Sequence, residues 1–281
     1  MSLNFAREVA LSAYYETDPE TKMALTRQAA QLWLALDHET DYGVVGHGGV
    51  QAPGRPLKPE LVSPKQVPKR NPVSAQGRAV HIHALAHIEF VATNLAWDAV
   101  LRFSGLPHAY YRDWAQVALE EAKHYEMLRD RLRQYGYDYG DFHAHNGLWQ
   151  MAEKTAEDPL HRMMLVPRYL EARALEAVPI MRRKFLEGGD QQTADILTEI
   201  GEEEIGHVAA GSRWFAALCK TRGMDRQQAF LDLLTSNGRF KYGSKGAVNR
   251  EVRLQAGFTP WELDQLDQLH HRSSRRPGSG G

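Results

Sequence analysis

The chain has 281 residues, of which 43% are hydrophobic and 25% are charged, and its formal net charge is −1 at pH 7. This composition is typical of a globular protein with a sizeable core, and the near-neutral charge gives no argument for a nucleic-acid or membrane partner. The single cysteine, Cys219, excludes an internal disulfide and an iron centre held by four thiolates.

Two predicted helices open the chain, and a long break follows them. Helical patterns cover residues 3–16 and 19–36, and Pro19 with Glu20 suits the first turn of a helix. Residues 37–72 contain six prolines and several glycines, so we expect no regular structure there. A loop of this length inside a domain is usually functional or lies along a surface.

Four long helical patterns come next, at residues 74–103, 107–135, 159–187 and 190–221. Short turns that contain Gly105 and Gly189 divide them into two pairs, and we interpret each pair as an antiparallel hairpin. The link between the hairpins, residues 136–157, is longer and includes a predicted short helix at 148–156. Two hairpins joined by a longer connection are typical of a ferritin-like four-helix bundle, so we predict an all-α fold of this kind.

The C-terminal part is predicted to be accessory. A short helix at 225–235 precedes a basic loop at 239–253, and a last helix begins at Thr259 and Pro260. The basic loop either holds an anionic substrate or is simply solvated, and the end of the chain at 275–281 is predicted to be disordered. The expected organisation is therefore N-terminal helices and a Pro/Gly-rich loop at 1–73, the bundle at 74–221, and a C-terminal segment at 222–281 packed on the bundle.

Two Glu-x-x-His motifs lie midway along the second helix of each predicted hairpin: Glu121 with His124, and Glu204 with His207. Each preceding helix offers a glutamate at a matching distance, Glu89 being 32 residues before the first motif and Glu171 being 33 residues before the second. A helix rises about 1.5 Å per residue, so antiparallel hairpins of this length bring such positions to the same height. The spacing predicts one site formed by both hairpins.

The character of the helix faces indicates a metal. Around Glu89, Glu121 and Glu204, the neighbours three, four and seven residues away are mostly apolar, so each glutamate lies on an inward face. Burying such carboxylates without cations is costly, whereas two divalent ions balance four carboxylates and two neutral imidazoles. Oxygen and imidazole ligands in this pattern suit iron or manganese. We predict two iron ions, with manganese or a mixed pair as alternatives, bound by Glu89, Glu121, His124, Glu171, Glu204 and His207.

Two assignments at this site stay open in the sequence. Glu171 has a less apolar face than the other glutamates, and Glu176 competes with it as the fourth carboxylate. Pro167 lies one turn before Glu171 and predicts a local kink. Tyr125 directly follows a predicted ligand and is the candidate catalytic residue with a redox role, although buried tyrosines more often only pack and form hydrogen bonds.

The other histidines are assigned to structural positions. His83 and His87 are spaced like a metal pair, but they share a helix face with Asn94 and lie far around the helix from Glu89. We therefore predict that they lie on a polar outer face, which Asp98 continues. His143 and His145 lie in the link between the hairpins, where a loop role is expected.

A resemblance to a known family comes from four segments: AHIEFVATNLAWDAVLRF, ALEEAKHYEMLRDRL, YLEARALEAVP and EEEIGHVAAGSRWF. They resemble an uncharacterised bacterial ferritin-like family of unknown function, which is distantly similar to the tRNA-modifying di-iron hydroxylase. The resemblance covers roughly residues 74–258. It implies the bundle fold and metal ligation at the six residues named above, and it implies no particular reaction.

Three functions are compatible with these patterns. The first is an O2-activating, hydroxylase-like di-iron oxidoreductase acting on a small molecule or a modified nucleoside; it needs an external electron donor, because no dinucleotide-binding fingerprint is present. The second is metal handling, as a ferroxidase, iron store or peroxide scavenger, although the long loop and extra helices would hinder packing into a storage shell. The third is a structural or RNA-binding protein stabilised by metal.

We expect a cytoplasmic protein without a membrane partner. No window approaches 18 apolar residues, and the first residues lack the uninterrupted apolar core of a signal peptide. The sequence leaves the oligomeric state open.

Overall fold

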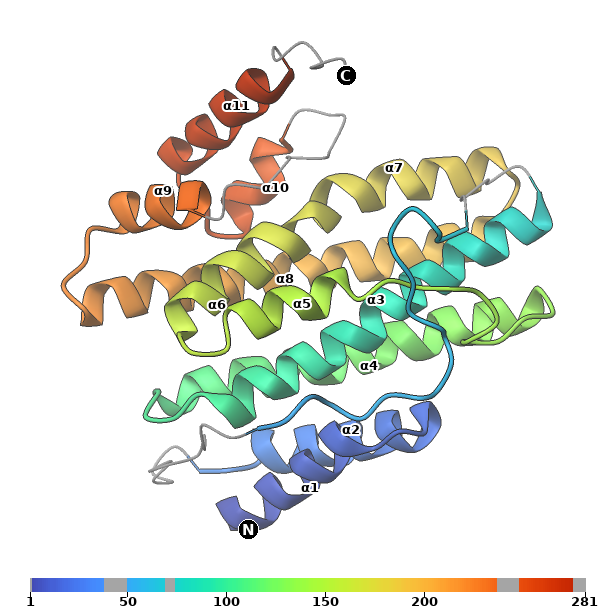
Figure 1. The fold of residues 1–281 in the computed structure, drawn as a ribbon, viewed down its shortest axis with the longest axis horizontal. Helices are drawn as coiled ribbons and strands as arrows, with labels where there is room; N and C mark the ends of the chain where they lie inside the picture. Colours follow the sequence, from blue (N-terminus) through green and yellow to red (C-terminus); the bar gives the residue numbers. More distant parts are fainter. Residues whose placement is uncertain (1, 38–49, 69–73, 237–247, 275–281) are drawn as a thin grey trace. The chain divides into compact units, whose positions relative to one another are not determined.

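The computed structural model describes residues 2–37, 50–68, 74–236 and 248–274 (Figure 1). Over these ranges the regular structure consists of helices, with no strand beyond one isolated bridge between Leu61 and Ala144, which confirms the predicted all-α class. None of the described helices is long and apolar enough to cross a membrane. Two compact units are present: unit 1 comprises Met1–Glu157 with Arg183–Ile196, and unit 2 comprises Asp158–Arg182 with Leu197–Gly281.

Unit 1 is built on one long helical hairpin. It contains α1 (Leu3–Tyr15), α2 (Pro19–Leu34), α3 (Ala75–Arg102), α4 (His108–Gln134) and α5 (Gly147–Lys154). α3 and α4 lie side by side, and α2 packs along α4 (Figure 1). Side-chain caps fix two of the starts, because Asp18 accepts the N–H of Thr21 at 2.9 Å and Ser74 accepts that of Gly77 at 3.0 Å. All five helices lie within two residues of their predicted bounds.

In unit 2, the predicted helix at 159–187 is interrupted. It consists of α6 (Pro159–Leu165), a π-helical turn (Val166–Leu170), a 3₁₀ turn (Glu171–Arg173) and α7 (Ala174–Glu187), the end of which belongs to unit 1. Pro167, where a local kink or a widened turn was expected, lies in the π-helical turn and cannot donate a helical hydrogen bond, so the structure has the widened turn. Gly211 on α8 (Gln191–Thr221) makes room for it, since a Cβ atom there would lie 2.5 Å from Cγ of Pro167.

The C-terminal helices of unit 2 are α9 (Arg226–Ser236), α10 (Arg250–Gln255) and α11 (Pro260–Ser274). The predicted loop at 239–253 is wrong at its end, because α10 begins at Arg250, where the Asn249 side chain caps the helix. Residues 239–247 of that loop and the predicted disordered end at 275–281 lie outside the described residues. Both arginines of α10 are in ion pairs: Arg250 contacts Asp264 and Asp267, and Arg253 contacts Glu176.

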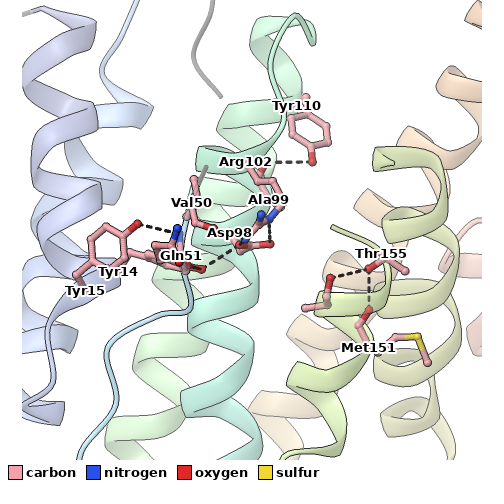
Figure 2. A network of polar contacts seen from close by, with 11 residues as sticks. Tyr14, Tyr15, Val50, Gln51, Asp98, Ala99, Arg102, Tyr110, Met151 and Thr155 are labelled. Atoms are coloured by element: carbon pink, nitrogen blue, oxygen red, sulfur yellow. Dashed lines mark hydrogen bonds and ion pairs between the residues drawn. The ribbon is translucent and has the colours of Figure 1, made fainter. Parts of the chain in front are cut away.

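The Pro/Gly-rich segment is non-helical over residues 50–68, as predicted, and lies against α3. Figure 2 shows the contacts at its start, where Arg102 donates to the carbonyl of Val50 at 3.0 Å and to Oδ1 of Asp98 at 2.7 Å. The Tyr14 hydroxyl donates to Oδ1 of Asp98 at 3.0 Å and lies 2.9 Å from the carbonyl oxygen of Gln51. Asp98 thus ties α1, α3 and this segment together.

The prediction of a polar outer face on α3 is wrong. His83, His87, Asn94 and Asp98 are all buried, with at most 9% of each residue exposed. The Pro/Gly-rich segment and the link at 137–146 cover this face and supply hydrogen-bond partners, as when the N–H of Gly140 donates to Nε2 of His83 at 3.0 Å. Helical periodicity cannot reveal a partner that arrives from an irregular segment.

Candidate metal centre

In unit 1, α3 and α4 bring three of the predicted ligands together. Glu121 and His124 are one turn apart on α4, and Glu89 on α3 lies opposite them. Nδ1 of His124 is 3.5 Å from Oε2 of Glu121 and 3.7 Å from Oε2 of Glu89. All three side chains are buried, and each can offer one ligand atom within 4.8 Å of those of the others. This buried glutamate–histidine group could hold a metal ion.

The electrostatics of this group show a need for positive charge. Burial, and then repulsion from Glu121, raises the pKa of Glu89 to about 8. Burial alone would lower the pKa of His124, but its contacts with Glu121 and Glu89 raise it overall to about 10. Without a metal cation, protons therefore supply the balancing charge among these three side chains.

In unit 2, the second Glu-x-x-His motif has the same local geometry. Glu204 and His207 are one turn apart on α8, both are buried, and Nδ1 of His207 lies 3.8 Å from Oε2 of Glu204. In both motifs it is thus Nδ1 that faces the carboxylate. Gly201 lies one turn before Glu204, and a Cβ atom there would be 3.0 Å from Cγ1 of Val178 on α7. The close approach of α7 to α8 beside this motif therefore leaves little room for a larger residue.

The two competitors for the fourth carboxylate have different surroundings. Glu176 accepts two hydrogen bonds from Arg253, at 2.7 and 2.8 Å, and one from the backbone N–H of Asn249 at 3.1 Å. Its charge is therefore already neutralised by the chain. Glu171 opens the 3₁₀ turn that follows the π-helical turn, and its Oε2 is buried. The pairing with Arg253 makes Glu176 the weaker candidate for a metal ligand.

Tyr125, the candidate redox residue, is fully buried between aromatic rings. Its ring centroid lies 5.6 Å from that of Phe90 and 5.2 Å from that of Tyr139, and its hydroxyl makes no hydrogen bond to the described residues. Sequence reasoning missed Tyr139, whose hydroxyl lies 2.9 Å from Nδ1 of His87. A tyrosine in an irregular link carries no periodic signal, so the sequence offers nothing that would single it out.

The remaining predicted residues occupy structural positions. His143 is half exposed in the link, 3.6 Å from Glu60, which agrees with a loop role. Cys219 is buried on α8, and burial raises the pKa of its thiol, which keeps it in the unreactive protonated form.

Comparison with known proteins places the chain in a family. A family described as "Protein of unknown function (DUF455)" matches residues 15–264, a range that includes both Glu-x-x-His motifs. The chain belongs to the DUF455 family. An uncharacterized protein of Haemophilus influenzae is 46% identical over 224 residues, covering 76% of this chain and 76% of the relative. No solved structure matches. The predicted membership of a family of unknown function is confirmed, and DUF455 itself assigns no reaction.

Proposed function

We propose that this protein is a non-haem di-iron oxidoreductase that activates O2, built on a ferritin-like four-helix bundle of α3, α4, α6–α7 and α8. The observation that carries the proposal is the buried group of Glu89, Glu121 and His124. Two carboxylates and an imidazole converge there, and the charged groups that act most strongly on Glu89 are Glu121 and His124. Such a group is stable when cations are bound in it.

The register of α4 and α8 supports joining the two motifs in one site. Within unit 1, Arg131 near the end of α4 donates to Oγ1 of Thr193 at 2.9 Å and to Oδ1 of Asp190 at 2.8 Å, at the start of α8. Glu121 is ten residues before Arg131, and Glu204 is eleven residues after Thr193. At about 1.5 Å per residue, both glutamates would lie about 15–17 Å from this contact along antiparallel helices.

The segment that carries Glu171 supports its role as the fourth carboxylate. A π-helical turn followed by a 3₁₀ turn re-aims the side chains after it, and π-bulges occur frequently at functional sites. Since Arg253 neutralises Glu176, Glu171 is the acid on this segment that we assign to the metals. The proposed ligands are Glu89, Glu121, His124, Glu171, Glu204 and His207.

The donor set fits iron, because four carboxylates and two neutral imidazoles balance two divalent ions. When bound, two ferrous ions would supply the electrons for the reduction of O2. The chain's own contribution is to bury the ligands away from water and to present Nδ1 of His124 and His207 beside the carboxylates. Further electrons would come from an external donor.

Tyr125 would serve this chemistry as a source of a hydrogen atom. Burial raises the pKa of its hydroxyl well above the ordinary value, so the proton stays on oxygen throughout the physiological range. The side chain follows His124 directly, and its hydroxyl is buried without a hydrogen bond to the described residues. A tyrosine held in this way can be oxidised only if its proton leaves with the electron.

The test measures metal content and the anaerobic optical response to Fe(II) followed by O2. Wild type should bind two metals per chain and give a transient absorbing species, and Glu121→Ala and Glu204→Ala should lose both. Glu202→Ala is the matched control, because Glu202 is exposed on the same helix as Glu204 and should leave metal content unchanged.

Two other outcomes would redirect the assignment. Two bound metals without any reaction toward O2 would favour metal storage or a structural role for the site. A chain that binds no metal after reconstitution with Fe(II) or Mn(II) would contradict the metal site itself.

A further inference from the structure

Unit 1 contains a partly open cavity on the side of α3 away from Glu89. This cavity has a volume of about 150 Å³ and is bounded by α3, the segment at 52–61, the link at 139–146 and α5. An apolar cavity of this size accommodates one benzene-sized ring. Nucleotide cofactors need pockets several times larger, so the volume already restricts the occupant to a small molecule.

The walls of the cavity favour a planar, uncharged occupant. Phe90, Tyr139 and Trp149 line it together with three prolines, and the rings of Phe90 and Tyr139 lie 5.3 Å apart at 31°. Aromatic walls of this kind stack on planar rings. The charged residues that line it, Arg55 and Glu153, are exposed and opposite in sign, so they give no net charge for an ion to pair with.

Both ring nitrogens of His87 already form hydrogen bonds within the chain, so they are not available to an occupant of the cavity. Its Nε2 lies 3.2 Å from the carbonyl oxygen of His145, which can only accept, so Nε2 carries the proton. Nδ1 is then the acceptor, and the Tyr139 hydroxyl donates to it at 2.9 Å. Burial lowers the pKa of His87 to about 4, so the ring is neutral and both of its nitrogens are already engaged.

On the α3 wall, Asn94 provides a polar contact for a ligand. The ammonium group of Lys22 donates to the carbonyls of Ala13 and Tyr14, both at 2.8 Å, and to Oδ1 of Asn94 at 2.9 Å. These three bonds use all the donors of Lys22, and they fix the Asn94 amide with its oxygen toward the lysine. The N–H groups of that amide are therefore what Asn94 can offer to an occupant of the cavity it lines.

We propose that this cavity binds a small, uncharged, single-ring aromatic or heteroaromatic molecule, whose ring nitrogen or carbonyl oxygen accepts a hydrogen bond from the Asn94 amide. The inference does not depend on the metals, because all of its residues belong to unit 1 and none of them is a proposed ligand. The occupant would lie against Phe90 and Tyr139, and both of these rings contact Tyr125, the residue after His124.

The test uses 3-fluoropyridine and fluorobenzene, which have the same shape and differ in one hydrogen-bond acceptor, in ¹⁹F NMR titrations of the full chain. Both should bind wild type saturably at millimolar concentration, and 3-fluoropyridine should bind roughly five-fold more tightly, the effect of one net hydrogen bond. Asn94→Asp keeps an acceptor for Lys22 but removes the amide donor. This variant should lose the preference for 3-fluoropyridine and keep its affinity for fluorobenzene within about two-fold.

A second variant fills the space. Ala52 lines the cavity and is itself exposed, so Ala52→Trp should fold normally and weaken the binding of both probes at least about ten-fold. Thermal unfolding of both variants confirms that they are folded. The proposal is overturned if neither probe binds wild type, if Ala52→Trp binds both probes as wild type does, or if benzoate binds more tightly than 3-fluoropyridine.

Discussion

Two buried acids of this chain, Glu262 and Glu89, are neutralised in different ways. In unit 2, burial would raise the pKa of Glu262, but the guanidinium of Arg168 at 2.8 Å holds it below its ordinary value. In unit 1, burial and repulsion from the carboxylate of Glu121 raise the pKa of Glu89. The nearby basic group is the imidazole of His124. The chain thus supplies a permanent cation for one buried acid. For the other it supplies an imidazole, a group that can bind a metal ion, which is the arrangement expected where a cation comes from outside.

The guanidinium of Arg168, which neutralises Glu262, is held in place by contacts on several sides. The guanidinium lies over the rings of Phe258, Phe215 and Phe230, at 4.4, 4.8 and 5.5 Å, and it also donates to Oγ of Ser212 at 3.0 Å. Burial lowers the pKa of this arginine to about 10, so it stays charged at neutral pH. Stacking and ion pairing together fix it as a structural group.

Removing this internal cation should have the largest effect. Arg168→Met removes the main partner of buried Glu262 and leaves Arg226, 3.0 Å from Oε2 of Glu262, as the remaining cation, so we expect the free energy of unfolding to fall by about 3 kcal/mol. Denaturation in urea, followed by circular dichroism, measures this loss. Because Arg168 and Glu262 are not among the proposed metal ligands, we expect the same loss of stability in metal-free protein.

Two further variants test whether the loss of stability comes from the charge of Arg168. Arg222 pairs with Asp158 at 2.8 Å in a partly exposed position, so Arg222→Met should cost less than about 1 kcal/mol. The double variant Arg168→Met with Glu262→Met should recover part of the loss, since an apolar pair of similar volume replaces the ion pair. Equal losses in the single and double variants would show that packing, and not charge, is what Arg168 contributes.

Supplying the external cation should have the next largest effect. Fe(II) or Mn(II), at a hundred times its dissociation constant, should stabilise the metal-free protein by about 2.7 kcal/mol, because the folded state alone holds the site. Thermal unfolding under anaerobic conditions, with and without metal, measures the shift. Glu121→Ala should show little or none of it, and an equal shift in wild type and this variant would mean that the metal binds elsewhere.

Two buried histidines, His124 and His83, extend the comparison, because their pKa values are shifted in opposite directions. Contacts with carboxylates raise the pKa of His124 to about 10, whereas burial lowers that of His83 to about 4. As pH falls from about 6.5 to about 4, the unfolded chain binds a proton at His83 and the folded chain does not, so stability falls. The contribution of His83 to this loss should reach about 2 kcal/mol at pH 5.

His83→Gln should reduce that dependence, since its amide oxygen can still accept from the N–H of Gly140 without titrating. The measurement is urea denaturation at several pH values between 4 and 7. His143→Gln is the control, because it makes the same substitution at a half-exposed position in the link that covers His83. A His83→Gln slope equal to that of wild type would assign the acid sensitivity to other groups.

Helical periodicity was sufficient for the long elements and for the first half of the site. The apolar stripes around Glu89 and Glu121 predicted their burial, and turn glycines predicted the hairpin of α3 and α4. What escaped prediction depends on contacts between distant segments. The pairing of Glu176 with Arg253, 77 residues away, and the burial of His83 under the link have no local pattern, so sequence left Glu176 open as a ligand and placed His83 in solvent.

The smallest expected effect is that of Glu89→Gln, and comparing it with Glu262→Gln tests directly whether the two buried acids are neutralised differently. In metal-free protein, Glu89→Gln removes a carboxylate that has no permanent cation beside it, so stability should change by less than about 1 kcal/mol. Glu262→Gln instead leaves Arg168 without its counter-charge and should cost at least about 2 kcal/mol. Thermal unfolding of both variants in a chelator gives the two values. Adding metal should then stabilise Glu262→Gln as it does wild type, and it should stabilise Glu89→Gln less, because one ligand charge is gone. If Glu89→Gln is as costly as Glu262→Gln without metal, then the chain neutralises Glu89 itself and the need for an external cation disappears.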